Sequence, residues 1–161
     1  MFAQAQESVM GPELDSLARE ADALAKVLHA LEAEQDALVN SDAGRLEDAI
    51  ADKNAALDGY LSAKTDREAR ILDEDLSGAV ANHPQLSAGQ RATGMELVGS
   101  IRAARQDCKA LNQRNGMLIS ALRDRTQQAI HIVRGGDSGL TLYGQQGNAH
   151  LDNGSRVLGT A

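Results

Sequence analysis

The feature that most constrains the fold is an apolar repeat that begins just after Pro12, with steps that alternate between three and four residues. Its members are Leu14, Leu17, Ala21, Leu24, Leu28, Leu31, Gln35 and Leu38. A repeat of this kind is typical of a helix that packs lengthwise against another helix. Pro12 suits the first turn of such a helix, and Asn40-Ser41-Asp42 indicates a turn. The pattern therefore predicts a first helix over about 12–40.

A second periodic segment follows from about Asp42. Its apolar face consists of Leu46, Ile50, Leu57, Tyr60, Leu61, Ile71, Leu72 and Leu76. Lys53 and Lys64 interrupt this face, where their aliphatic stems can lie along it. Because proline disfavours helix in the residue before it, His83-Pro84 marks a break. We therefore expect a second helix over 42–81.

A third segment opens at Ser87, which together with Gln90 has the form of a capping box. Its apolar positions at helical spacing are Met95, Val98, Ile101, Cys108, Leu111, Leu118, Ile119, Leu122, Ala129, Ile130 and Val133. Gly135-Gly136 ends the pattern, so a third helix is predicted over 88–134. Gly94, Gly99 and Gly116 within it permit either close helix approach or bending, or are simply tolerated.

These segments predict an all-α protein: an antiparallel bundle or coiled coil of three long helices with a flexible C-terminal tail. Residues 1–11 are expected to be a flexible N-terminus and residues 12–134 a helical domain. Residues 135–161 are glycine-rich and are expected to be a flexible tail. Within this tail, Leu140-Thr141-Leu142-Tyr143-Gly144 is either a short recognition motif or a segment that folds back on the bundle.

Composition and charge narrow the function. Aromatic residues make up 2% of the chain, and the net charge of −7 argues against nucleic-acid binding. The charge is uneven: Pro12 to Leu76 holds 17 acidic and 7 basic residues, whereas Ala88 to Arg134 holds 3 acidic and 8 basic residues. These charges are interpreted either as solvated faces with complementary rims or as a preference for antiparallel pairing between neighbouring helices.

Nothing in the sequence assembles a catalytic or cofactor site, so we expect no enzyme activity, no cofactor and no bound metal. The four histidines share no metal-ligand spacing with each other or with Cys108, the only cysteine. Cys108 is interpreted as a small apolar residue of a helix seam. No stretch approaches the about 18 apolar residues of a membrane span. These observations indicate a cytoplasmic protein that neither inserts into membranes nor binds nucleic acid.

The most specific string lies in the C-terminal third. It reads Leu111-Asn112-Gln113-Arg114-Asn115-Gly116, then Leu118-Ile119, then Thr126-Gln127-Gln128-Ala129, then Thr141-Leu142-Tyr143-Gly144 and Gly147. This string, with Glu32 to Leu38 and a downstream Lys53-x-x-x-Leu57, resembles the FlgN family of flagellar export chaperones. The likeness spans roughly Leu14 to Gly147.

The resemblance implies a chaperone that binds the C-terminal segments of hook-associated proteins, prevents their premature assembly and delivers them to the flagellar type III export gate. It further implies that the C-terminal helical part holds the client protein. On this basis the candidate client-binding residues are Leu111, Asn115, Met117, Leu118, Ile119, Leu122, Ala129, Ile130 and Val133.

For the tail, the resemblance implies that Leu142, Tyr143 and Gly144 dock on the cytoplasmic domain of the export gate protein. The export ATPase complex is a further candidate partner. An alternative that needs no client is a structural coiled-coil adaptor that self-associates through its helical seams. That alternative leaves the Leu-Tyr-Gly motif unexplained.

Overall fold

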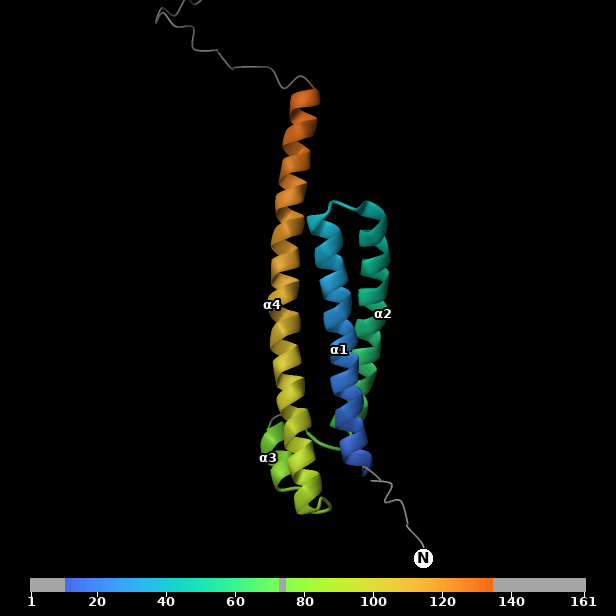
Figure 1. The fold of residues 1–161 in the computed structure, drawn as a ribbon, viewed down its shortest axis with the longest axis vertical. Coiled ribbons are helices and arrows are strands. Elements are labelled where there is room, and N and C mark those ends of the chain that lie inside the picture. The colour runs from blue at the N-terminus through green and yellow to red at the C-terminus, as the bar shows by residue number, and fades with distance from the viewer. Residues whose placement is uncertain (1–10, 73–74, 135–161) are drawn as a thin grey trace, which may run out of the picture. The chain divides into compact units, whose positions relative to one another are not determined.

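The structure is a computed structural model, and it describes residues 11–72 and 75–134. Among these residues it contains helices and no strand, which confirms the predicted all-α class. The helices are α1 (Pro12–Val39), α2 (Ala43–Glu68), α3 (Leu76–Ala81) and α4 (Ala88–Val133) (Figure 1). A boundary between two compact units falls within α4, between Arg123 and Asp124, so the two units are described separately.

The first helix and the turn after it follow from local sequence. Pro12 lies at the first position of α1, and acidic residues in the first turn face the positive end of the helix dipole. After Val39 the chain reverses through Ser41, whose φ of 54° is left-handed. The carboxylate of Asp42 then accepts the backbone N–H of Arg45 at 3.0 Å. The expected turn is therefore also the N-cap of α2.

The prediction of one helix over 42–81 is wrong, because α2 ends at Glu68 and a separate six-residue helix, α3, follows. The side chain of Arg67 donates to the backbone oxygen of Ile71 at 2.9 Å and so holds the chain where it leaves the helix. Asp75 then caps α3 by accepting the N–H of Gly78 at 3.0 Å. An aspartate stabilises the start of a helix better than its interior, which favours a new helix at this point.

The predicted break at His83-Pro84 and the start of the last helix are both confirmed. The backbone N–H of Ser87 donates to Oε1 of Gln90 at 2.9 Å, and the N–H of Gln90 donates to Oγ of Ser87 at 3.3 Å. This reciprocal pair is the capping box. From it α4 runs unbroken for 46 residues.

Polar contacts between the helices define their directions in the first unit, up to Arg123. Glu20 and Glu34 of α1 bond Arg67 and Lys53 of α2, so α1 and α2 form an antiparallel hairpin (Figure 1). By contrast, α1 and α4 run parallel. Arg105 bonds Glu20, Cys108 bonds Leu24 and Asn115 bonds Leu31, at separations of 85, 84 and 84 residues. The antiparallel pairing considered from the charges is therefore wrong for α1 and α4, whose opposite charges attract across a parallel pair.

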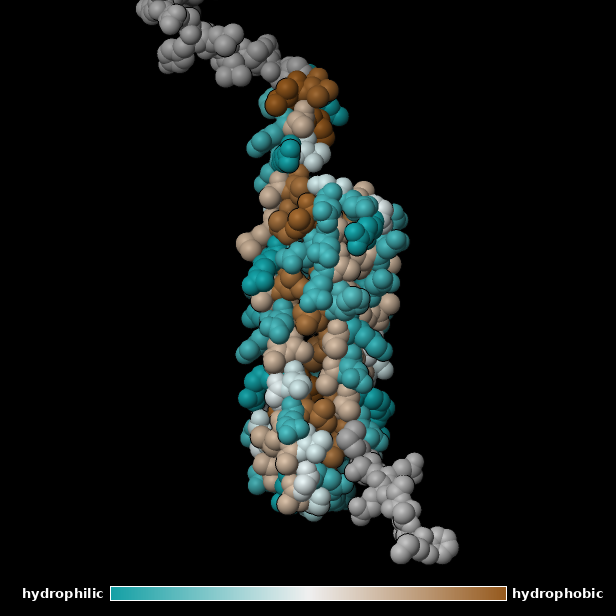
Figure 2. Space-filling model, viewed as in Figure 1, coloured by the Kyte–Doolittle hydropathy of each residue, from teal (hydrophilic) through white to brown (hydrophobic). Residues whose placement is uncertain are grey.

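The core follows the repeat of α1. Leu14, Leu17, Leu24, Leu31 and Leu38 are buried, while Ala21, Leu28 and Gln35 are partly buried. The main cluster unites α1 with the segments around it, and its members are Leu14, Leu17, Leu24, Ile71, Leu76, Val80, Leu86, Val98 and Ile101. A smaller cluster joins Val27 and Leu31 to Leu111. Figure 2 shows the resulting interrupted column of apolar surface between α1 and α4.

Of the three glycines singled out in α4, one lies at a close approach. A Cβ on Gly94 would stand 2.7 Å from Cγ1 of Val80 and 3.1 Å from Cδ2 of Leu14. A Cβ on Gly99 or Gly116 would meet nothing within 4 Å. Gly94 therefore lets α3 and α1 pack directly on the α4 backbone, whereas the other two serve no packing requirement.

Candidate protein-binding surface

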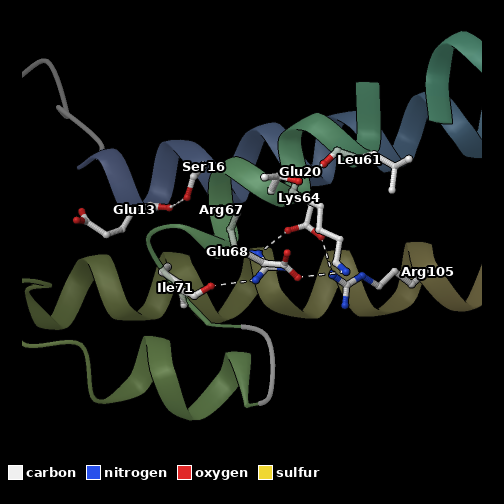
Figure 3. A network of polar contacts seen from close by, with 10 residues as sticks. Glu13, Ser16, Glu20, Leu61, Lys64, Arg67, Glu68, Ile71 and Arg105 are labelled. Atoms are coloured by element: carbon white, nitrogen blue, oxygen red, sulfur yellow. Dashed lines mark hydrogen bonds and ion pairs between the residues drawn. The ribbon is translucent and has the colours of Figure 1, made fainter. Parts of the chain in front are cut away.

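Two buried polar layers fix how α1, α2 and α4 lie together. In the first layer, Oε2 of Glu20 accepts Nε of Arg67 at 2.6 Å, and Oε1 accepts Nη2 of Arg105, also at 2.6 Å (Figure 3). The side chains of Glu20 and Arg67 are fully buried, and that of Arg105 is partly exposed. One carboxylate from α1 thus receives a guanidinium from each neighbouring helix.

The second layer repeats this arrangement two heptads further along α1. Oε1 of Glu34 pairs with the ammonium group of Lys53 from α2. Nδ2 of Asn115 from α4 donates to Oε2 of Glu34 and to the backbone oxygen of Leu31, both at 2.9 Å. Glu34 and Asn115 are buried. Again an α1 carboxylate bonds one partner from α2 and one from α4.

Between the two layers lies Cys108, which contacts both apolar clusters. Its thiol donates to the backbone oxygen of Leu24 at 3.8 Å. Burial, with a smaller effect of the Asp107 carboxylate, raises the pKa of the Cys108 thiol. A thiol held in its neutral form is a weak nucleophile, which agrees with the interpretation of Cys108 as a packing residue.

In the first unit, the structure divides the candidate client-binding residues by their distance along α4. Leu111 and Asn115 are buried against α1 and are not part of the surface. Leu118 and Leu122 are partly buried. Met117 and Ile119 are exposed, at 66% and 45%. The apolar seam of α4 is therefore covered by α1 as far as Asn115 and increasingly open beyond it.

In the second unit, every described residue from Asp124 to Arg134 is exposed. The candidates Ala129, Ile130 and Val133 are among them, and Val133 is 85% exposed. Ile132, which the sequence reasoning missed because it lies off the seam, is 78% exposed. Figure 2 shows these apolar side chains gathered at the C-terminal end of α4. Exposed aliphatic side chains that gather on one stretch of a helix are typical of an interaction surface.

The hairpin offers further surface that the sequence reasoning did not assign. Ile50, Leu57 and Leu61 form an exposed stripe on α2, since positions seven and eleven residues apart share a helix face. A groove of about 730 Å³ runs between α1 and α2, and its walls are largely alanine, including Ala25, Ala33 and Ala55.

The candidate docking residues Leu142, Tyr143 and Gly144 lie outside the described residues, as does the rest of the glycine-rich tail. In the described part of the chain, no group of three or more histidine, cysteine or acidic side chains is placed to hold a metal ion. No helix within 11–72 and 75–134 is both long enough and apolar enough to cross a bilayer.

The buried carboxylates were the main site feature that sequence reasoning missed. Glu20 and Glu34 occupy positions beside the seam where a solvent-exposed acid is the usual expectation. The only signal was their spacing: two glutamates 14 residues apart match Lys53 and Arg67, which are also 14 apart. Such matching indicates two polar layers at two-heptad spacing.

Comparison with known proteins identifies a family that this chain matches. A family model described as FlgN protein matches residues 14–150, which is most of the chain. The match includes all of α1 beyond its first two residues, the other three helices and the Leu-Tyr-Gly motif. Searches of curated proteins and of solved structures found no match.

Proposed function

Because this chain belongs to the FlgN family of flagellar export chaperones, we propose that it binds the C-terminal segments of hook-associated proteins in the cytoplasm. It prevents their premature assembly and delivers them to the flagellar type III export gate. The surface that binds the client consists of Leu118, Ile119 and Leu122 in the first unit. The candidate Met117 is not part of it, because it lies two residues from Asn115 and therefore on the opposite side of α4 from the seam. In the second unit it consists of Ala129, Ile130 and Val133.

The observation that carries this proposal is the seam of α4 that α1 leaves uncovered. A client that polymerises through amphipathic terminal helices needs its apolar face covered until secretion. An exposed helical seam supplies such a face, as in other helix-in-groove complexes. Leu111 and Asn115, which are buried, support the surface without being part of it.

The tail completes the proposed cycle. Leu142, Tyr143 and Gly144 dock on the cytoplasmic domain of the export gate protein, and the export ATPase complex is a further partner in delivery. This separates the two tasks along the chain, with client binding on α4 and docking in the segment that follows. Support for this division is the family match, which extends to residue 150.

Titration calorimetry with the purified C-terminal segment of a hook-associated protein tests the proposal. The full chain is expected to bind this segment stoichiometrically. Ile119→Glu and Ile130→Glu each place a charge on the seam and should weaken binding at least tenfold, or about 1.4 kcal/mol. The matched controls Ser120→Glu and Gln128→Glu add the same charge at exposed positions off the seam and should bind normally.

Absence of binding by the wild-type chain would overturn the chaperone proposal. Light scattering then decides whether the self-associating adaptor replaces it. A tight oligomer whose size is independent of concentration, and which Ile119→Glu dissociates, would favour the adaptor. A monomer that binds the client favours the chaperone.

A further inference from the structure

We propose that Arg105 and Asn115 are positioning residues that lock α4 in a single register against α1 and thereby set where the client surface begins. The register is a property of the free protein, so only its consequence for client binding rests on the proposed function. Both residues act through buried carboxylates of α1 and do not touch the client.

The apolar contacts alone leave the register weakly defined. A heptad seam that slips by seven residues still places apolar side chains against apolar side chains. Thus Leu24, which now lies level with Cys108, would meet Ile101 after a slip of α1 toward the N-terminus of α4. Packing of leucine, isoleucine and valine therefore distinguishes poorly between neighbouring registers.

The polar layers distinguish clearly between the observed register and its neighbours. Glu20 bonds Arg105, and Glu34 bonds Asn115. If α1 moved by seven residues toward the N-terminus of α4, Glu20 would face Val98 and Glu34 would face Cys108. If it moved the other way, Glu34 would face Leu122. Each slip removes the α4 partner of at least one buried carboxylate, which is strongly unfavourable.

The chemistry of Asn115 points to specificity as its role. Its Nδ2 makes two hydrogen bonds to α1, whereas its Oδ1 is buried without a partner in the part of the chain that the structure describes. A leucine at this position would fill the seam without an unsatisfied acceptor. A single buried asparagine in a helix seam is known to fix register at some expense of stability.

The register has a functional consequence because it determines where α1 ends along α4. With the observed separation of 84 residues, Val39, the last residue of α1, lies level with Arg123. Leu118 and Leu122 now lie beside the last turns of α1 and are partly buried. A slip of seven residues toward the C-terminus of α4 would place them level with Val27 and Leu31, and would so cover more of the seam. The bonds of Arg105 and Asn115 to α1 thus preserve the exposed surface that the client needs.

The test compares the register in the wild-type chain and in Arg105→Met/Asn115→Leu by electron–electron distance measurements. Spin labels are placed at Asp22 of α1 and Ser120 of α4, both exposed, in a Cys108→Ala background. This double variant leaves Glu20 paired with Arg67 and Glu34 paired with Lys53, so the hairpin keeps both of its ion pairs. A second label pair, Asp22 with Asn54 of α2, monitors the hairpin.

The wild-type chain is expected to give one distance between Asp22 and Ser120. The double variant should give an additional population displaced by about 10 Å, the rise of seven helical residues, with the Asp22–Asn54 distance unchanged. Ile101→Ala, which weakens the same interface without removing a polar contact, should be less stable and keep one distance. This control separates loss of register from loss of stability.

A single wild-type distance in the double variant would overturn the proposal, as would the displaced population in Ile101→Ala. Failure of the wild-type chain to bind a hook-associated protein would instead overturn the chaperone function and leave the register result standing. Where both hold, the double variant should also bind the client more weakly in titration calorimetry.

Discussion

The carboxylate of Glu20 and the guanidinium of Arg67 form an ion pair at 2.6 Å in which both side chains are fully inaccessible to solvent. Arg67 also donates to the backbone oxygen of Ile71 where the chain leaves α2. The pair therefore joins three features of the fold: the hairpin, the end of α2 and, through Arg105, the α1–α4 interface.

Glu20→Ala should destabilise the protein by about 3–5 kcal/mol, because it leaves a buried guanidinium without its carboxylate. Urea unfolding followed by circular dichroism measures this change. Asp22→Ala, at an exposed position on the same helix, is the control and should change stability by less than about 0.5 kcal/mol. Equal effects of the two substitutions would contradict the structural role of the pair.

Gly94→Ala and Gly99→Ala should have opposite effects on stability. An alanine at 94 would crowd Val80 and Leu14 in the core, which is expected to cost about 1–3 kcal/mol. An alanine at 99 meets no neighbour within 4 Å and removes backbone freedom within a helix, so it should stabilise by about 0.5–1 kcal/mol. Thermal unfolding of the two variants provides the comparison, and stabilisation by Gly94→Ala would refute the close approach.

The rate of alkylation of Cys108 should begin to rise at a higher pH in the folded protein than in the unfolded protein. Burial favours the neutral thiol, so its pKa lies above the ordinary value of 9.0. The folded state then keeps a proton that the unfolded state begins to lose near pH 9.0, and folding stability should decline as the pH rises past that value. Iodoacetamide reaction rates in buffer and in urea measure the difference, and coincident profiles would contradict it.

Tyr143→Ala should reduce motility of the cells while leaving titration of the hook-associated segment unchanged. The proposed docking role assigns Tyr143 to the export gate and the α4 seam to the client. Gln145→Ala, two residues further on, is the control and should swim normally. A Tyr143→Ala chain that loses client affinity but retains gate binding would reverse the assignment of the two tasks.

The elements that could be predicted from the sequence are those fixed by local patterns. The α1 repeat, the turn at Asn40–Asp42 and the capping box at Ser87 each depend on residues within one or two turns of each other, and each is present. The end of α2 could not be predicted in this way. It depends on Arg67, whose partner Glu20 lies 47 residues away.

The sequence could predict which residues contribute to the candidate surface, but only partly where along α4 the exposed part begins. Periodicity assigns Leu111, Asn115, Leu118 and Leu122 to one face of α4, and it contains no information about how far α1 extends along that face. The polar layers that set this extent are tertiary contacts. The sequence alone therefore indicates a surface polar residue at Asn115, and only its bonds to Leu31 and Glu34 show that it is buried.

The exposure of every side chain from Asp124 to Arg134 has a thermodynamic consequence. Each ordered residue gives up about 1–2 kcal/mol of backbone conformational entropy, and in these turns no side-chain burial offsets that loss. Helical order there rests on hydrogen bonds that extend from the preceding turns. A partner that covers Ile130 and Val133 provides the missing burial, so its affinity depends on the helix propensity of these turns as well as on the contacts themselves.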